Sequence, residues 1–401
     1  MAVAKARNRR AAQRKNNLVV QPSGCVNSFY PGGVNIPTWP VATERERELL
    51  SQVLDSGQWG GFHEMVARFE RAFAEFHHCA GGVSAANGTV TLEMALEAAG
   101  LGPGDEVVVP AISFISTASA VSRVGATPVF VDIEELSFNM DAARAAAAVT
   151  PRTKAILAVH FGGPLADMER LPALARDRGL ALIEDAAHAH GSEWNGRRAG
   201  SFGLAGSFSF QNSKVMTAGE GGILIGNDRE FLDRAWSIAN CGRRRDGGWF
   251  HHYTPGSNYR ITAWQAAVLL AQLERLPEQI ALRTRNARLL KRELADLAEL
   301  RFQQAPPQVT AHSHYLLLGR VGGNRDEFHK ALVARGVPCT PFYPHALYGN
   351  PLYASGGCRV EPCPVAEECV RDAFWLPCRA LMGDERTTRE IAAAIRQALG
   401  R

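Results

Sequence analysis

Short apolar runs alternate with amphipathic segments along the first half of this chain. Runs rich in Val, Ile and Leu predict buried strands, and segments with an apolar residue every three or four positions predict helices. Their regular alternation is typical of a largely parallel sheet flanked by helices. The expected strands lie near 106–110, 127–132, 154–159 and 180–184, and the expected helices near 43–56, 63–77, 114–124, 139–148 and 167–178.

The second half of the chain predicts a hairpin, a long helix and a smaller domain. The alternating run 205–210 predicts a buried strand, and 221–225 predicts its hairpin partner. A helix near 262–298 would carry the chain into its C-terminal part, where Pro306 and Pro307 mark a loop. We therefore expect an α/β protein in three parts: a basic disordered tail over 1–20, a large domain with an N-terminal arm over 21–275, and a small C-terminal α/β domain over 276–401.

The composition is that of a globular protein. Apolar residues make up 46% and charged residues 21% of the 401 residues, which is enough for two sizeable cores. The sequence has no apolar run of the roughly 18 residues that a membrane helix needs, and its start shows no signal-peptide pattern. We expect a cytoplasmic protein without a membrane partner.

Positive charge is concentrated at the N-terminus. The formal net charge is +4, whereas the first 15 residues alone carry six Lys and Arg residues and no acid, so the rest of the chain is slightly negative. Such a tail would suit a DNA-binding regulator, but a solvated disordered extension is the simpler interpretation. The sequence has no helix-turn-helix signature, and we expect no nucleic-acid partner.

The cysteines do not predict a metal site. Eight cysteines are scattered along the chain without a Cys-x-x-Cys pair. The late group from Cys358 to Cys378 invites a zinc interpretation, but its spacing matches no common zinc site. Reduced thiols without a bound metal are expected in a cytosolic protein.

One lysine and one aspartate stand in settings that favour chemistry. Lys214 lies in a turn of small and polar residues between the two expected hairpin strands, at the mouth of a core. A solvated surface charge is the ordinary alternative for a lysine. Asp185 ends the apolar run 180–184 and is followed by His188. Acids at the carboxyl ends of parallel strands are common in active sites, although a helix cap or turn residue is the alternative.

A third candidate element is Asn87-Gly88-Thr89, which precedes a helical pattern. The amides of Gly88 and Thr89 would point at a phosphate docked on the positive end of that helix; an ordinary helix start is the alternative. Pyridoxal phosphate chemistry needs a lysine to hold the aldehyde as a Schiff base and a carboxylate to keep the pyridine nitrogen protonated. Lys214 and Asp185 fit those two roles.

Together these motifs resemble the DegT/StrS family of fold-type I pyridoxal phosphate aminotransferases, which aminate keto sugars and keto cyclitols. The resemblance runs from about Thr43 to the C-terminus. Its motifs are Asp55-Ser-Gly-Gln-Trp-Gly-Gly61 with Phe69-Glu70, Asn87-Gly-Thr89, 110–117, 125–132, Glu184-Asp-Ala-Ala-His188, the lysine segment 208–222 and Gly256-Ser-Asn-Tyr-Arg260.

The resemblance implies roles for the residues around the reacting part of the cofactor. Lys214 would hold pyridoxal 5'-phosphate and move a proton during transfer. Asp185 would face the pyridine nitrogen, and His188 would lie beside the phenolic oxygen. Phe114 would stack on the cofactor ring, for which a flat aromatic face is suited.

The resemblance also implies how the phosphate is held. Gly88, Thr89 and Ser209 would bind it within one chain, and Asn258 would reach it from the neighbouring subunit. This arrangement implies a homodimer with shared active sites. The alternative for Asn258 is that it caps, within its own chain, the helix that begins near Thr262.

Different segments of the chain resemble different subgroups of this family, and these subgroups act on different substrates. The segments 210–214 with 216–220, 240–246 and 313–315 resemble the amino-hydroxybenzoate synthases and the glutamine-dependent ketocyclitol aminotransferases, whereas 341–351 resembles the substrate loop of sugar and cyclitol transaminases. We expect transfer from glutamine or glutamate to a keto sugar or ketocyclitol in antibiotic biosynthesis, with a 3-amino-5-hydroxybenzoate synthase-like enzyme as the alternative. The candidate substrate residues are Trp59, Arg260, Tyr343 and His345.

Two other enzyme classes are disfavoured. Some relatives of the family carry a histidine in place of the lysine and act as dehydratases, so Lys214 favours amino transfer. A nicotinamide dehydrogenase would also suit the α/β pattern. However, no expected strand is followed by Gly-x-Gly-x-x-Gly at the start of a helix.

Overall fold

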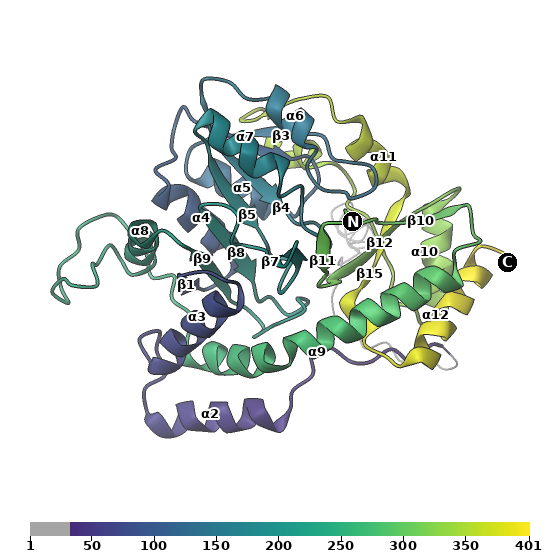
Figure 1. Ribbon diagram of the computed structural model, residues 1–401, viewed down its shortest axis with the longest axis horizontal. Helices are drawn as coiled ribbons and strands as arrows, with labels where there is room; N and C mark the ends of the chain where they lie inside the picture. The colour runs from purple at the N-terminus through teal and green to yellow at the C-terminus, as the bar shows by residue number, and fades with distance from the viewer. Residues whose placement is uncertain (1–32) are drawn as a thin grey trace, which may run out of the picture.

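A central sheet of eight strands organises residues 33–401, which this computed structural model describes (Figure 1). In spatial order the strands are β1 (Gly81–Ala85), β9 (Gly222–Gly226), β8 (Ala205–Ser209), β5 (Ala181–Asp185), β4 (Thr153–Val159), β2 (Glu106–Pro110), β3 (Thr127–Val131) and β14 (Arg359–Val360). Neighbours from β8 to β14 pair in parallel, and β9 pairs antiparallel with β8 and β1. The expected largely parallel sheet and the expected hairpin are therefore confirmed.

Helices cover both faces of this sheet (Figure 1). The helices of this part are α2 (Glu44–Ser56), α3 (Glu64–Phe76), α4 (Gly88–Ala98), α5 (Ser116–Arg123), α6 (Ala142–Ala147), α7 (Arg170–Arg178) and α8 (Arg229–Ala239). Of these, α2 packs mainly on the long helix α9 (Ala263–Glu293), beyond which it lies in Figure 1. Local sequence signals set where several of them begin. Thr43 forms a capping box with Glu46 at the start of α2. The Asn87 side chain accepts a hydrogen bond from the Val90 amide at the start of α4.

The central strands are mostly apolar because each face of the sheet meets a separate core. Val107 and Val109 of β2 belong to one cluster, with side chains of α4, α5 and α8. Val108 belongs to the other, with side chains of α2 and α3. Successive strand residues point to opposite faces, so a sheet that is buried on both sides needs the continuous apolar runs seen in the sequence.

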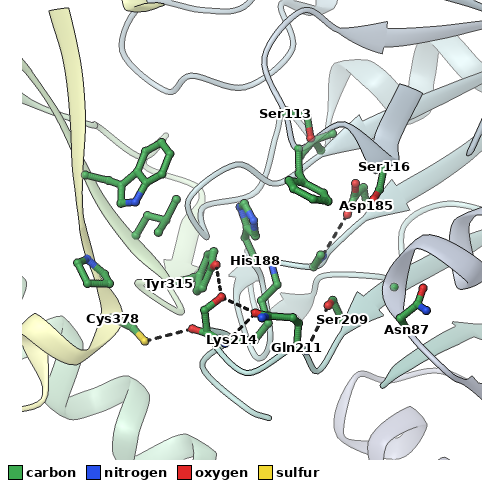
Figure 2. Close-up of a pocket in the computed structure, with 18 of the residues that line it drawn as sticks. Asn87, Ser113, Ser116, Asp185, His188, Ser209, Gln211, Lys214, Tyr315 and Cys378 are labelled. Carbon is green, nitrogen blue, oxygen red and sulfur yellow. Dashed lines mark hydrogen bonds between the residues drawn. The ribbon is translucent and has the colours of Figure 1, made fainter. Parts of the chain in front are cut away.

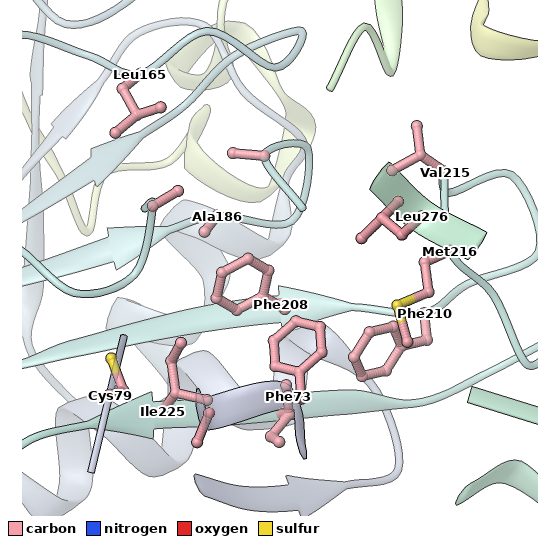
Figure 3. Close-up of a cluster of buried hydrophobic side chains, with 14 of the residues drawn as sticks. Phe73, Cys79, Leu165, Ala186, Phe208, Phe210, Val215, Met216, Ile225 and Leu276 are labelled. Carbon is pink, nitrogen blue, oxygen red and sulfur yellow. The ribbon is translucent and has the colours of Figure 1, made fainter. Parts of the chain in front are cut away.

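One of these cores also anchors the turn that carries Lys214. Figure 3 shows Phe73 of α3 beside Phe208 and Phe210, and the Phe73 ring centroid lies 5.0 and 5.4 Å from theirs. Met216, two residues after Lys214, is fully buried in the same cluster. The turn is therefore fixed by apolar packing on its inner side, which leaves the lysine on the outer side.

The long helix α9 (Ala263–Glu293) leads to a smaller antiparallel sheet. Its strands, in spatial order, are β10 (Leu300–Phe302), β12 (Leu316–Val321), β15 (Ala373–Pro377) and β13 (Thr340–Pro341). The other helices of this part are α10 (Arg325–Ala334), α11 (Pro364–Asp372), α12 (Glu385–Ala398) and the short 3₁₀ turns η1 (Leu347–Gly349), η2 (Pro351–Tyr353) and η3 (Cys378–Leu381). Side chains of α9, α10 and α12 pack on this sheet in a third apolar core.

Two C-terminal strands pair with the N-terminal part of the chain. β14 adds a parallel strand beside β3, and β11 (Val309–Ala311) pairs with β6 (Glu193–Trp194), which in turn pairs with β7 (Arg197–Arg198). The expected boundary between 275 and 276 falls within α9, and a division into domains there stays a prediction. The predicted tail over 1–20 lies outside the described residues.

Candidate active site

A cavity of about 890 Å³ opens at the carboxyl ends of the parallel strands, where ligands of open α/β sheets commonly bind. Figure 2 shows Asp185 at the end of β5, Ser209 at the end of β8 and Lys214 in the turn that follows β8. The smaller sheet closes the other side with Leu316 of β12 and Trp375 of β15. The predicted site residues that line this cavity are Gly88, Thr89, Phe114, Asp185, His188, Ser209, Lys214 and Tyr343.

Two hydrogen bonds fix the backbone of Lys214, and the groups around its side chain set the pKa of its amine. Its amide donates to the Gln211 carbonyl at 2.9 Å, and its carbonyl accepts from the Trp39 indole at 3.0 Å. Burial lowers the pKa of Lys214 to about 8, although the nearby Asp185 carboxylate opposes that change. The Nζ atom lies 4.4 Å from the centre of the Tyr315 ring. Lys214 is therefore a neutral amine far more often than an exposed lysine, and the neutral form is the nucleophile.

Asp185 is a buried carboxylate that is held by hydroxyl groups. Thr117 Oγ1 donates to Asp185 Oδ2 at 2.7 Å, and the Ala187 amide donates to Oδ1 at 3.3 Å. The Ser113 hydroxyl lies 2.7 Å from Thr117 Oγ1. Because Thr117 has a single proton and gives it to Asp185, Ser113 donates to Thr117. Burial raises the pKa of Asp185, and within residues 33–401 no lysine or arginine side chain forms an ion pair with it.

His188 presents a hydrogen-bond donor to the cavity. Its Nδ1 accepts from the Gly162 amide at 3.2 Å, and burial lowers its pKa well below the ordinary value. The ring is therefore neutral, and this hydrogen bond assigns its proton to Nε2. The ring also packs on Tyr315, with the two centroids 4.4 Å apart.

The start of α4 lies at one end of the cavity, where Figure 2 labels Asn87 and Ser209. As first-turn groups, the Gly88 and Thr89 amides have no partner within their helix, and the Thr89 hydroxyl lies 2.6 Å from the Ser116 hydroxyl. A Cβ atom on Gly88 would lie only 2.7 Å from the Ser209 Cβ, so the glycine lets α4 approach β8 closely. Free amides and hydroxyls at a helix start suit a phosphate.

Two aromatic side chains complete the lining. Phe114 is 57% exposed although it lines the cavity, so a face of its ring is free for a flat ligand. Tyr343 lies on the side of the smaller sheet, with its ring centroid 5.4 Å from that of Trp375. Both residues line the cavity, and the stacking role of Phe114 and the substrate role of Tyr343 stay predictions.

Asn258 lies outside the lining of the cavity in the single chain. It is exposed and forms an isolated backbone bridge with Asn240. Thr262 caps α9 through a capping box with Gln265. The alternative prediction that Asn258 caps this helix is therefore wrong, because Thr262 holds the cap position. Contact of Asn258 with a phosphate in a second subunit stays a prediction.

Three predicted substrate residues also lie outside this lining. Trp59 packs on Trp264 with ring centroids 5.4 Å apart. The Arg260 guanidinium lies 5.0 Å from the centre of the Phe62 ring. His345 makes a hydrogen bond with the carbonyl of the next residue at 3.1 Å. The substrate contacts predicted for Trp59, Arg260 and His345 stay predictions.

Sequence reasoning missed residues that hold the predicted ones in place. Thr117 ends the motif 110–117 but received no role, and its contact with Asp185 spans 68 positions. Tyr315 belongs to the segment 313–315, whose sequence pattern assigns it no role. Its hydroxyl makes a 2.8 Å hydrogen bond with Ser213, the residue before Lys214. The only sequence signal for either residue was its membership of a family motif.

The described residues show no other site that the sequence had suggested. Within residues 33–401 no group of three or more His, Cys, Asp or Glu side chains is arranged to hold a metal ion. In the same range no helix is long and apolar enough to cross a membrane.

Comparisons with known proteins agree with this geometry. The model of the DegT/DnrJ/EryC1/StrS aminotransferase family matches residues 40–396. A 3-amino-5-hydroxybenzoate synthase of Amycolatopsis mediterranei is 40% identical, with 91% of this chain and 97% of the relative covered. An L-glutamine:2-deoxy-scyllo-inosose aminotransferase of Streptoalloteichus tenebrarius is 38% identical, with 90% and 94% covered. The crystal structure of a 3-amino-5-hydroxybenzoic acid synthase superposes with a TM-score of 0.88 at 38% identity, with 92% of this chain and 100% of that chain covered.

The cofactor of this family is pyridoxal phosphate, and another solved structure of the same fold, 26% identical to this chain, is of a PMP form. The cavity fits this group on three counts. Lys214 offers a nucleophilic amine, Asp185 is a buried carboxylate that forms no ion pair with a lysine or arginine of residues 33–401, and the first-turn amides of α4 at the opposite end have no partner within their helix. Phe114 would stack on the ring, and His188 would donate from Nε2 to the phenolic oxygen.

The chemistry divides between the cofactor and the side chains. When bound, the cofactor takes up the electron pair that remains on a carbon after its proton has left. Asp185 would support this by holding a proton on the pyridine nitrogen, and Thr117, which donates to Asp185 Oδ2, would keep that carboxylate oriented. The neutral amine of Lys214 would accept a proton at Nζ from one carbon and deliver it to another. The chain is therefore a pyridoxal phosphate-dependent aminotransferase and belongs to the DegT/DnrJ/EryC1/StrS family.

Proposed function

We propose that this enzyme transfers an amino group from glutamine or glutamate to a ketocyclitol or keto sugar in antibiotic biosynthesis. The observation that carries the proposal is the similarity, over nine tenths of the chain, to a glutamine-dependent aminotransferase whose acceptor is a scyllo-inosose. The acceptor side of the cavity supports it, because Tyr315, Thr340 and Tyr343 place hydroxyl groups among aromatic faces. Such a lining suits a ring that carries several hydroxyl groups.

A second candidate is the reaction that forms an aminohydroxybenzoate. It is favoured by the 40% identity to a 3-amino-5-hydroxybenzoate synthase and by the TM-score of 0.88 to a solved structure of such a synthase. The two candidates share the fold and the cofactor and differ in the substrate and in the product.

An assay of the purified holoenzyme tests both candidates. Glutamine and glutamate are each offered as donor against a panel of ketocyclitols, keto sugars and unsaturated cyclic keto acids. Mass spectrometry detects the aminated product, and ultraviolet absorbance detects a new aromatic ring. An amino cyclitol or amino sugar supports the proposal, whereas an aromatic amino acid product supports the second candidate. Absence of transfer to every ketone in the panel contradicts both.

We also propose that the enzyme works as a homodimer with shared active sites. Figure 1 shows the chain between α8 and α9, the 242–257 loop, projecting from the body. This loop and its surroundings expose large aromatic side chains, which is unusual for a surface that faces only water. The exposed fractions are 49% for Trp59, 52% for Phe62, 56% for Trp249, 85% for Phe250 and 44% for Tyr253.

Arginines add to this surface. Arg243 and Arg244 lie 4.5 and 4.4 Å from the centres of the Trp249 and Tyr253 rings. Exposed aromatic and arginine side chains are the residues that interfaces favour. A second copy of the chain seated here would bring Asn258 near a neighbouring site, as the family resemblance implies. The cytoplasmic location and the absence of nucleic-acid and membrane partners also stay predictions.

A further inference from the structure

One face of the smaller sheet forms a wall of the active-site cavity. Successive residues of a strand point to opposite faces of a sheet. In β15, Phe374 and Leu376 accordingly belong to the apolar core of the smaller sheet, whereas Trp375 and Pro377 line the cavity. Thr340 of β13 also lines the cavity, and it is the residue paired with Trp375 across the two strands. Directly paired residues share a face of the sheet, so Trp375 and Thr340 are neighbours at the cavity.

Trp375 and Thr340 each carry a polar group that the described chain does not use. Within residues 33–401 the Trp375 indole N–H and the Thr340 hydroxyl form no hydrogen bond. Neither group is sealed inside the protein, because neither is among the fully buried polar atoms of this part of the chain that have no partner. Both side chains are only partly exposed and line the cavity. Their polar groups are therefore available to a ligand in the cavity.

Aromatic neighbours hold the Trp375 ring in place. Its centroid lies 5.4 Å from that of Tyr343 and 5.7 Å from that of Phe342, with interplanar angles of 63° and 70°. Edge-to-face contacts of this kind are favourable, and two of them restrict rotation of the indole. The direction of its N–H is thus set before a ligand arrives, which reduces the entropy lost on binding.

The cofactor does not account for these two groups. Its expected contacts come from the large sheet and from the loops that follow its strands: the start of α4, Phe114 and Lys214. Trp375 and Thr340 belong to the smaller sheet, which closes another side of the cavity. A ketone that reacts at the cofactor extends the rest of its ring away from the reacting carbon, so this wall is available to that ring.

The chemistry of the two groups matches a ring with several hydroxyl groups. An indole N–H only donates a hydrogen bond, whereas the threonine hydroxyl can donate or accept one. Hydroxyl groups of a cyclitol can do both, so two of them can satisfy Trp375 and Thr340 together. Because the two side chains are cross-strand neighbours, they offer these contacts side by side on a rigid element.

We propose that Trp375 and Thr340 determine acceptor specificity by binding hydroxyl groups of the acceptor ring. The Trp375 N–H donates to one hydroxyl oxygen, and the Thr340 hydroxyl forms a hydrogen bond with another. The proposal rests on the proposed function in one respect, which is that the acceptor carries several hydroxyl groups. A site of this kind rejects analogues without those groups, because its own polar groups are then left unpaired. Neither residue takes part in moving the proton.

The test compares Trp375→Phe and Thr340→Val with wild type. Each variant keeps an apolar side chain of similar shape and loses one polar group. The acceptor half-reaction is followed on the amine form of the holoenzyme by the change in cofactor absorbance, with a pentahydroxycyclohexanone and with cyclohexanone. We expect the rate at a low concentration of the pentahydroxycyclohexanone to fall about tenfold to a hundredfold in each variant, the effect of leaving one polar group unsatisfied. The rate with cyclohexanone should stay unchanged.

Two further variants are the controls. Trp194→Phe makes the same chemical change at a buried tryptophan that lines no part of the cavity, and it should behave as wild type. Thr340→Ser keeps the hydroxyl and should keep the preference for the pentahydroxycyclohexanone. The donor half-reaction with glutamine or glutamate should change little in every variant, which shows that the cofactor and Lys214 are still in place.

Inositol gives a readout that needs no reaction, because it has the hydroxyl groups of a cyclitol but no ketone. In calorimetric titrations of the holoenzyme, inositol should bind wild type and bind Trp375→Phe and Thr340→Val more weakly. Cyclohexanol should bind the three proteins alike. If wild type aminates no ketone but inositol shows this pattern, the proposed function fails and the role of the two residues stands.

Two results would overturn the proposal. One is an unchanged rate with the pentahydroxycyclohexanone in both variants, together with unchanged inositol affinity. The other is an equal loss with the pentahydroxycyclohexanone, cyclohexanone and the amino donor, which would indicate a structural role. If wild type neither aminates a ketocyclitol nor binds inositol, this proposal and the proposed function both fail.

Discussion

The Nζ atom of Lys214 lies 4.4 Å from the centre of the Tyr315 ring. An aromatic face attracts an ammonium ion, so this contact favours the protonated lysine. Burial acts in the opposite direction and lowers the pKa of Lys214 to about 8. The hydroxyl of Tyr315 is tied to Ser213 at 2.8 Å, which fixes the ring beside the lysine turn. Tyr315 is therefore placed to set both the position and the protonation of the catalytic amine.

Replacement of Tyr315 should change the pH dependence of amino transfer. Free Lys214 must be neutral to accept a proton, so the rate of the acceptor half-reaction should rise with pH and level off above about 8. Tyr315→Leu keeps the site apolar but removes the ring, which stabilises the ammonium form by about 0.5–2 kcal/mol. The apparent pKa should therefore fall by about one. Tyr315→Phe keeps the ring and should change the apparent pKa little. Single-turnover rates between pH 6.5 and 9.5 measure the apparent pKa. A profile of Tyr315→Leu that moves to higher pH would show that the ring does not stabilise the ammonium form of Lys214.

Lys214 should carry the cofactor covalently. Borohydride reduction of the holoenzyme followed by peptide mapping should find the label on the peptide with Lys214. Lys291 offers an internal control, because burial also lowers its pKa to about 8 but it lies outside the cavity. A label on Lys291 would mean that a low pKa alone, and not the cavity, decides which lysine reacts.

Asp185→Asn should keep the fold and lose the chemistry. The amide fills the same space but cannot hold a proton on the pyridine nitrogen. The single-turnover rate should fall about a hundredfold to a thousandfold, as for other electrostatic deletions in active sites. Thr117→Val removes the hydroxyl that contacts Asp185 Oδ2 and should cause a smaller fall. Thermal unfolding of both variants checks the fold. Near-normal deamination by Asp185→Asn would show that Asp185 is not needed to hold a proton on the pyridine nitrogen.

Gly88→Ala should weaken the binding of pyridoxal phosphate. The added methyl group would lie 2.7 Å from the Ser209 Cβ, so α4 or β8 must move and the amides of the anion site move with it. We expect the dissociation constant of the cofactor to rise about tenfold or more, the effect of a local overpacking cost. Gly102→Ala is the matched control, because its Cβ would meet only one atom, at 3.9 Å. Equal affinity in the two variants would show that the close approach of α4 to β8 does not shape the phosphate site.

Subunit mixing tests the shared active site. Neither Lys214→Ala nor Asn258→Ala alone should be fully active, since one loses the amine and the other a contact to the phosphate. If Asn258 reaches across the dimer, a mixed dimer contains one site with both residues intact, and activity should return on subunit exchange. If Asn258 serves its own chain, each site of the mixed dimer lacks one residue and no activity returns. A fully active monomer in solution would also contradict the shared site.

The sequence by itself determined the elements and the local chemistry of this protein. Alternating apolar runs predicted the strands and the hairpin around Lys214, since side-chain period and turn composition are local properties. The position of Asp185 at the end of an apolar run, and of Gly88 and Thr89 at a helix start, pointed to their roles for the same reason. Membership of the family then identified pyridoxal phosphate as the cofactor that these residues would bind together.

The tertiary structure decided which distant residues complete the site. The partner of Asp185 lies 68 positions earlier, and the ring beside Lys214 belongs to Tyr315, the residue before β12 of the smaller sheet. Trp375 and Thr340 become neighbours at the cavity only because β13 pairs with β15. These contacts depend on sheet order and on helix packing, which bring together residues that share no local pattern. A sequence motif can therefore identify a candidate catalytic lysine, whereas only the fold shows which side chains lie around that lysine.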